Sequence, residues 1–137
     1  VVNTLKYSVD TNKVQIEIHI DESFQIKTDE SRLRVILNNL IANAFKYQDF
    51  TKPKPFLRIR ASAQDNSKRI QIEDNGIGIR SEYHGKLFEM FYRATDTSTG
   101  SGLGLYIARE AVDKLNGQIS FESEFGKGSL FTITLPT

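Results

Sequence analysis

The amino-acid sequence predicts a two-layer α/β sandwich, in which helices cover one face of a mixed β-sheet. Residues 29–47 and 103–115 carry apolar side chains at helical spacing, and short stretches around them alternate apolar and polar residues as strands do. The chain also closes on a predicted hairpin. The 137 residues, of which 39% are hydrophobic, fit one compact domain with a single core.

The first half of the chain is expected to contain a strand, a long helix and a hairpin. Residues 14–20 (VQIEIHI) alternate strictly and predict a strand. Residues 29–47 predict a helix that Thr28 or Asp29 can cap, and residues 53–55, with two prolines, predict the loop that follows it. Two further strands are expected at 56–61 and 68–73, joined by a turn at 65–67. The apolar stripe of the helix is Leu33, Ile36, Leu37, Leu40 and Ala44.

The second half begins with a break in the strand pattern at residues 74–79 (DNGIGI). Residues 81–101 match no regular pattern and end in a small polar stretch that we expect to be mobile. A helix is predicted at 103–115, and Asn116 and Gly117 should end it. The closing hairpin is predicted from strands at 118–123 and 129–135.

Composition excludes several classes of function. Eighteen basic and 17 acidic residues leave a formal charge of +1, so no nucleic-acid or membrane surface is indicated. The sequence has no cysteine, which excludes disulfides, thiol catalysis and cysteine-based zinc sites. No apolar run is long enough to cross a bilayer, and the first residues lack a secretory signal pattern, so we expect a cytoplasmic domain.

Polar side chains on the long predicted helix form the first candidate site. Asn39, Asn43 and Lys46 share a narrow stripe beside the apolar face, and Tyr47 follows them. Amide oxygens suit a hard cation such as Mg²⁺, and an ammonium group suits a phosphate. On its own, however, this stripe is better explained as a solvated helix face.

Two glycine-containing segments are further candidates. Asp74 at the end of a strand, beside a sharp glycine turn, can accept a hydrogen bond from an amino group, although an ordinary Asp-Asn-Gly turn would give the same pattern. Residues 100–105 (GSGLGL) open a helix, where backbone N–H groups can bind phosphate or form a simple hinge. The spacing matches neither the dinucleotide GxGxxG nor the GxxxxGK[ST] phosphate loop.

An aromatic segment lies between the two glycine segments. Phe88 and Phe91 could anchor a lid on the core or simply pack within it. Neither histidine has an acidic residue patterned near it for catalysis or metal binding, so His19 is predicted to be an exposed strand residue and His84 a loop residue.

Taken in order, these segments resemble the ATP-binding family shared by gyrase, the heat-shock chaperone, mismatch-repair ATPases and histidine kinases. The resemblance is greatest to sensor histidine kinases and covers nearly the whole chain. Residues 39–47 (NLIANAFKY) resemble their N box, 74–79 their first glycine box, 87–93 (LFEMFYR) their F box and 100–105 their second glycine box. Residues 119–136 resemble their terminal hairpin. The resemblance implies the Bergerat-type ATP-binding fold over residues 1–137, with a lid at about 80–101.

The resemblance also implies roles for individual residues at the phosphate end of the site. Asn43 would bind Mg²⁺ with Asn39 close by, and Lys46 would contact phosphate oxygens. Asn39, Lys46 and Arg93 are the implied catalytic residues, with Arg93 as a contact of the γ-phosphate. The second glycine box would present N–H groups to the phosphates, and its implied nucleotide-binding residues are Ser101, Gly102, Leu103, Gly104 and Leu105.

At the base end, the resemblance implies that Tyr47 packs on the adenine and that Asp74 accepts a hydrogen bond from the adenine amino group. Gly76 and Gly78 would let the backbone pass the base, and Ile79 would help to wall the pocket together with Leu103. One departure lies nearby, because Leu130 stands where many relatives have a small hydroxyl residue before the Phe, so we expect one polar contact near the base to be missing. A second is the shortness of the polar stretch at 95–99.

The implied activity is transfer of the γ-phosphoryl group of Mg-ATP to a histidine on a separate helical dimerisation and phosphoacceptor domain, from which it passes to a response regulator. Such transfer depends on positioning and charge neutralisation. The chain shows no acceptor-histidine pattern, so the isolated domain is expected to be a monomer that does not phosphorylate itself. No partner nucleic acid and no direct membrane contact are expected, and the resemblance implies a cytoplasmic domain, either of a cytoplasmic protein or of a membrane-bound sensor.

Three alternatives remain from the sequence. A family ATPase that drives a clamp would need a glutamate where Asn39 stands, and a kinase of serine in regulatory proteins usually has a carboxylate in the N box. A non-catalytic nucleotide sensor would keep the binding site without transfer.

Overall fold

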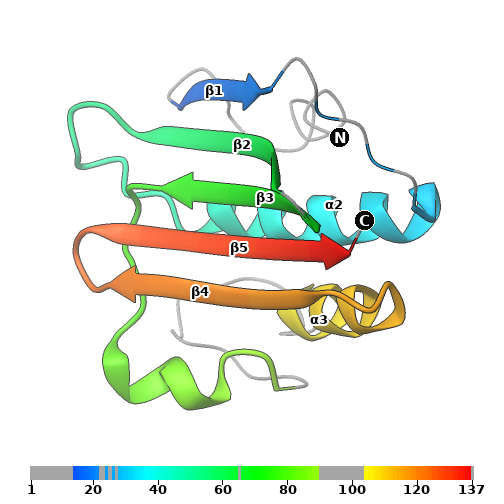
Figure 1. The fold of residues 1–137 in the computed structure, drawn as a ribbon. Coiled ribbons are helices and arrows are strands. Elements are labelled where there is room, and N and C mark those ends of the chain that lie inside the picture. Colours follow the sequence, from blue (N-terminus) through cyan, green and yellow to red (C-terminus); the bar gives the residue numbers. More distant parts are fainter. Residues whose placement is uncertain are drawn as a thin grey trace.

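The computed structural model describes residues 14–21, 24, 26, 28–64, 66–89 and 104–136. Figure 1 shows a sheet with helices behind it. In chain order the elements are β1 (Gln15–Ile20), α2 (Glu30–Lys46), β2 (Phe56–Gln64), β3 (Ser67–Asp74), the 3₁₀ helix η2 (Ser81–Lys86), α3 (Gly104–Lys114), β4 (Gln118–Glu124) and β5 (Gly128–Pro136).

Within the described residues the strands form one sheet with the order β1-β2-β3-β5-β4. β1 runs parallel to β2, whereas the other neighbouring strands are antiparallel, so the sheet is mixed. Both α2 and α3 lie on the same face of this sheet (Figure 1). The prediction of a two-layer α/β sandwich with helices on one face is therefore confirmed.

Helix α2 forms as its sequence predicts. Asp29 is the N-cap residue, and its carboxylate accepts a hydrogen bond from the Arg32 amide at 3.2 Å, which satisfies one of the free amides of the first turn. Ile36, Leu40 and Ala44 of the predicted stripe are buried. Leu33 and Leu37 are partly buried against the same core, so the whole stripe faces the sheet.

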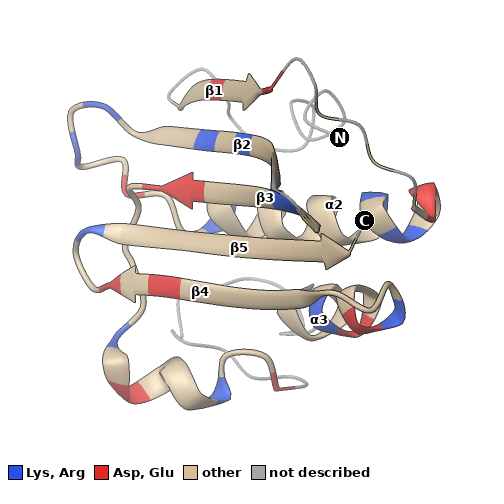
Figure 2. Cartoon of the chain, viewed as in Figure 1, with Lys and Arg blue, Asp and Glu red and all other residues tan. Residues whose placement is uncertain are grey.

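The two faces of the sheet differ in polarity because successive side chains alternate between them. One row of paired positions on the helix-covered face contains Ile59, Ile72 and Phe131, all of which are buried. On the open face, Arg58 pairs with Glu17 at 2.7 Å and with Glu73 at 2.9 Å. Figure 2 shows the basic segments of β2 beside acidic segments of β1 and β3, as expected for a face that water covers.

The structure extends several predicted elements. β2 continues to Gln64, and β3 already begins at Ser67. The pairs Ala63–Lys68 and Gln64–Ser67 prolong the antiparallel ladder almost to the turn. Polar residues can prolong a ladder near a hairpin turn, where an alternating apolar pattern is no longer needed.

Two further details concern the helices. α3 ends at Lys114, and Asn116 adopts the left-handed conformation with φ of 60°, as predicted for the stop signal. Residues 81–86 form η2, where no element was predicted.

The small polar stretch at 95–99 lies outside the described residues. In the part of the chain that is described, no helix is both long enough and apolar enough to span a membrane.

We predict that Ile36→Ala lowers the free energy of unfolding by about 2–5 kcal/mol, because the side chain is fully buried between α2 and the sheet. Val35→Ala is the matched control on the same helix, since Val35 is 39% exposed and should cost less than about 1 kcal/mol. Urea denaturation of both variants measures the difference, and equal losses would contradict the assigned orientation of α2.

Candidate functional site

The C-terminal half of α2 contacts both glycine segments. At one end, the Ile77 amide donates a hydrogen bond to the Tyr47 carbonyl at 2.8 Å, which ties the first glycine segment to the end of the helix. About two turns earlier, the Asn39 amide oxygen lies 3.3 Å from where a Cβ on Gly104 would be, so the start of α3 lies beside Asn39. The helix therefore lies beside the first glycine segment and beside Gly104, where the described part of the second begins.

The amide side chains of α2 differ in their hydrogen bonds. The Asn39 side-chain nitrogen donates to the Val35 carbonyl at 2.8 Å, which turns the amide oxygen away from its own helix. The side chain of Asn43 is partly buried and makes no hydrogen bond to any residue that the structure describes, while Lys46 is exposed. Amide oxygens without a partner fit the oxygen coordination that Mg²⁺ prefers, so this donor set is compatible with a magnesium site completed by phosphate.

Asp74 ends β3 on the helix-covered face and is only 5% exposed. One carboxylate oxygen accepts a hydrogen bond from the Gly76 amide at 2.8 Å. Burial raises the pKa of Asp74 to about 7, although the Gly76 amide and the charge of Lys52 oppose this rise. Asp74 therefore closes the turn. It also places a carboxyl group that titrates near neutral pH, and that can accept hydrogen bonds, in a nearly dry position.

Both glycines of the first glycine segment approach other backbone segments closely. A Cβ at Gly76 would overlap the carbonyl of Tyr47, and a Cβ at Gly78 would overlap the carbonyl of Glu124. Gly78 also has a φ of +75°, which favours glycine. Packing within the protein thus already requires these glycines, independently of the nucleotide contact that the resemblance implies. Ile79, which follows them, is buried in the core.

A hydroxyl side chain lies beside Asp74, but it comes from Ser129 and not from position 130. Ser129 pairs with Asp74 across β3 and β5 and shares its face with buried Phe131. Leu130 pairs with Glu73 on the open face, so the departure noted there does not remove a hydroxyl from the neighbourhood of Asp74. The alternation of β5 counted back from Phe131 could have identified Ser129 from the sequence.

Ser123 continues this polar row and joins it to the glycine segment. Its Oγ lies 2.8 Å from Ser129 Oγ, donates to the Gly128 carbonyl at 3.0 Å and accepts from the Ile79 amide at 2.8 Å. The position of the first glycine segment is therefore fixed from the β4–β5 side as well as from α2.

Lys52, which belongs to none of the predicted motifs, contacts the same segment from the loop after α2. Its Nζ donates to the carbonyls of Asn75 and Gly76 at 2.6 and 2.9 Å. A lysine just before a proline-containing loop looks like an ordinary solvated charge, so no sequence pattern signalled this contact.

Phe88 and His84 contribute to packing. Phe88 lies edge-on to Phe121 and Phe131, with ring centroids 5.7 and 6.3 Å apart, so it packs into the core. His84 is not a loop residue as predicted, because it lies in η2, with Nε2 2.9 Å from the Ile79 carbonyl and its ring edge-on to Phe121. His19 is exposed on β1, as predicted.

Several predicted site residues lie outside the described part of the chain, namely Phe91, Arg93, Ser101, Gly102 and Leu103. Gly104 and Leu105 form the first turn of α3, and Leu105 is partly buried against the core. The lid predicted at about 80–101 is described only as far as residue 89.

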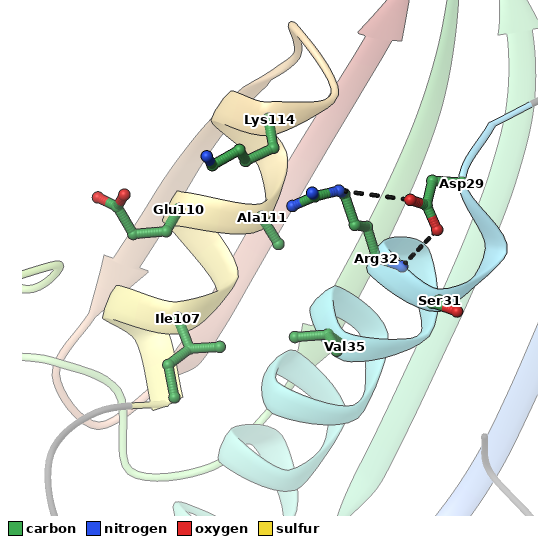
Figure 3. Close-up of a pocket in the computed structure, with 8 residues that line it drawn as sticks. All are labelled: Asp29, Ser31, Arg32, Val35, Ile107, Glu110, Ala111 and Lys114. Carbon is green, nitrogen blue, oxygen red and sulfur yellow. Dashed lines mark hydrogen bonds and ion pairs between the residues drawn. The ribbon is translucent and has the colours of Figure 1, made fainter.

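A separate hollow of about 420 Å³ lies between the first half of α2 and α3 (Figure 3). Val35, Ile107 and Ala111 line its apolar part, and the Asp29–Arg32 ion pair lies at its rim. It contains none of the predicted site residues, so it is distinct from the candidate nucleotide site.

Comparisons with known proteins agree with this arrangement. The family model described as histidine kinase-, DNA gyrase B-, and HSP90-like ATPase matches residues 28–137. The autoinducer 2 sensor kinase/phosphatase LuxQ of Vibrio parahaemolyticus is 39% identical over 88% of this chain, and the match spans 15% of the length of LuxQ. The chain thus corresponds to a small part of that relative.

Solved structures of histidine kinases share the fold. The mycobacterial sensor histidine kinase MprB matches with a TM-score of 0.83 and 25% identity, over 98% of this chain and 88% of that chain. Full-length ShkA in complex with AMPPNP matches with a TM-score of 0.76 and 29% identity, over 90% of this chain and 25% of that chain. The chain therefore belongs to the histidine kinase-, DNA gyrase B- and HSP90-like ATPase family, within which it groups with the catalytic domains of sensor histidine kinases.

Proposed function

We propose that this chain binds Mg-ATP and transfers the γ-phosphoryl group to a histidine on a separate helical dimerisation and phosphoacceptor domain of the same kinase. The observation that carries the proposal is the contact of one helix, α2, with both glycine segments, through Tyr47 at one end and Asn39 nearer its middle. A nucleotide has a base and a phosphate chain, and the helix lies beside a candidate site for each. The AMPPNP complex of ShkA supports a nucleotide ligand for a similar structure.

The phosphate end is assigned to the polar stripe of α2. Asn43 would hold Mg²⁺ through its amide oxygen with Asn39 beside it, and Lys46 would neutralise phosphate charge. When bound, the metal ion would supply charge neutralisation for the transferring phosphoryl group. Arg93 and residues 101–105 are proposed to complete this end, with the lid at about 80–101 closing over it.

The base end is assigned to Asp74 and its neighbours. The buried carboxylate accepts a hydrogen bond from the adenine amino group, while Tyr47 and Ile79 supply apolar contacts to the ring. Gly76 and Gly78 keep the backbone of the first glycine segment close to the base.

Transfer breaks the bond between the γ-phosphorus and its bridging oxygen and forms a bond to a histidine nitrogen. This reaction needs positioning more than a general base. Asn39 fits that requirement, because it is neutral and its nitrogen is held by the Val35 carbonyl. A clamp-driving ATPase is disfavoured, since an amide cannot take a proton from an attacking water molecule.

We further propose that the domain works in two-component signal transduction in the cytoplasm, as a monomer when isolated, with a response regulator as the downstream acceptor. The expected partner domain is helical, and no nucleic-acid partner or membrane contact is proposed. The similarity to LuxQ, a sensor kinase/phosphatase, supports this assignment.

We predict that the isolated chain binds Mg-ATP but acquires no acid-labile label from radiolabelled ATP, because the acceptor histidine lies elsewhere. Addition of the helical phosphoacceptor domain of the same kinase should produce labelled phosphohistidine on that domain. Binding of Mg-ATP without any transfer would identify a nucleotide sensor instead, and label on His19 or His84 would contradict the assignment of a separate acceptor.

Asn43→Ala is expected to weaken Mg-ATP binding by at least tenfold while the melting temperature stays nearly unchanged, because the side chain makes no described hydrogen bond that supports the fold. Asn38→Ala is the matched control, since it removes the same amide from the same helix outside the candidate stripe. Titration calorimetry measures the Mg-ATP affinity of both variants, and thermal melts measure their melting temperatures. Full affinity with a lowered melting temperature in Asn43→Ala would assign Asn43 a structural role.

Asp74→Asn is expected to reduce the preference for ATP over GTP. The carboxylate is an acceptor only and suits the adenine amino group, whereas guanine presents a carbonyl at the same position. In the variant the amide oxygen keeps the bond from the Gly76 amide, and the amide nitrogen, a donor, then faces the adenine amino group. An unpaired buried donor costs on the order of 1–3 kcal/mol, so ATP should lose roughly tenfold in affinity and GTP, whose carbonyl can accept from that nitrogen, much less. Competition binding measures the ratio, and an equal loss of both nucleotides would leave Asp74 with its turn-closing role alone.

The same variant separates recognition from stability. Because the pKa of Asp74 is raised from 3.8 to about 7 in the folded state, the parent should lose stability as pH rises from about 4 to about 7, on the order of 2–4 kcal/mol. Asp74→Asn can keep the bond to the Gly76 amide but cannot ionise, so this loss should disappear. Denaturation at pH 5 and pH 8 provides the comparison.

A further inference from the structure

Lys52 lies in the loop between α2 and β2 and is partly buried against the first glycine segment. Its ammonium group donates hydrogen bonds to two consecutive carbonyls, those of Asn75 at 2.6 Å and Gly76 at 2.9 Å. An ammonium has three donors and no acceptor, so it can bridge carbonyl oxygens that would otherwise repel each other. Bonds of this charged kind are stronger than bonds between neutral groups.

The side chain of Asn75 makes a second connection between the same two segments. Asn75 Oδ1 accepts from the Phe56 amide at 2.8 Å, and Asn75 Nδ2 donates to the Lys54 carbonyl at 2.9 Å. Residues 52–56 are thus linked to the turn at 75–76 by one side chain from each segment, Lys52 from the first and Asn75 from the second. Four hydrogen bonds resist any displacement of this turn from the loop.

The held turn is the one that closes on Asp74. The Gly76 amide donates to the Asp74 carboxylate, and the next amide, of Ile77, donates to the Tyr47 carbonyl. The two peptide groups whose carbonyls bond to Lys52 are therefore the same ones that supply the amides of these two hydrogen bonds. The charge of Lys52 also acts on Asp74 and favours its ionised form.

We propose that Lys52 is a positioning residue for base recognition: by holding the carbonyls of Asn75 and Gly76, it fixes the turn that orients the Asp74 carboxylate toward the base. Lys52 acts through the turn and does not touch the nucleotide. This inference rests on the proposed function, since it assigns Lys52 a part in the same adenine site.

The first test needs no nucleotide. Lys52→Met keeps most of the aliphatic stem and removes the ammonium, so amide hydrogen exchange at Gly76 and Ile77 should become roughly tenfold faster in the free protein. Lys54→Met is the matched control, because the Lys54 side chain is exposed and only its backbone carbonyl takes part. Unchanged exchange at both amides in Lys52→Met would overturn the proposal.

The second test measures ATP and GTP affinities of the same variants. Lys52→Met should lose roughly tenfold for ATP and less for GTP, whereas Lys54→Met should match the parent. Equal losses for both nucleotides would show that Lys52 contacts the phosphates or only supports the fold, and would overturn the positioning role. Lys52→Arg keeps the charge and the donors, so it should retain the parent's ratio of ATP to GTP affinity; loss of that ratio would also count against the proposal.

The two measurements distinguish failure of this inference from failure of the proposed function. A parent protein that does not bind ATP would contradict the nucleotide site, and the exchange data would still decide whether Lys52 orders the turn. A parent that prefers ATP, with unchanged exchange and ratio in Lys52→Met, would leave the function standing and remove Lys52 from it.

Discussion

The hydrogen bond from the Ile77 amide to the Tyr47 carbonyl is the contact on which the candidate site depends. It joins the end of α2 to the first glycine segment, and it requires the two backbones to approach so closely that Gly76 can carry no side chain. Because α2 is fixed by its buried stripe against the sheet, this contact places the end of β3 in a defined position relative to the helix. The polar stripe of α2 and the carboxylate of Asp74 therefore belong to one rigid arrangement.

The arrangement includes a destabilising element. A carboxyl group that is only 5% exposed and has a pKa raised to about 7 lowers the stability of the folded protein at any pH at which the group is ionised. The surrounding structure limits this cost with donors and a cation: the Gly76 amide, the Ser129 amide and Lys52 all favour the ionised form. The proposed nucleotide recognition would explain why an acid stands at a position where an apolar residue would pack without penalty.

The sequence predicted the elements that follow simple periodicity and the residues that form contiguous motifs. The stripe of α2, its Asp29 cap and the five strands required only spacing and capping rules. Ser129, Ser123 and Lys52 were missed because their importance arises from pairing across strands or from a loop that folds back. Leu130 lies beside buried Phe131 and therefore on the opposite, open face, so strand alternation places Ser129 rather than Leu130 next to Asp74.

The two ends of the candidate site differ in how they are built. The base end consists of short backbone and side-chain links among α2, β3, β4 and the loop at 52–56, so its acceptor is held in place before any ligand arrives. Preorganised groups lose little entropy on binding and discriminate sharply between bases. At the phosphate end, Asn43 and Lys46 lack described partners, and their charge and oxygen atoms suit any nucleoside triphosphate. Affinity for the triphosphate and selectivity for adenine are therefore expected to be separable properties, the first residing on α2 and the second in the turn held by Lys52.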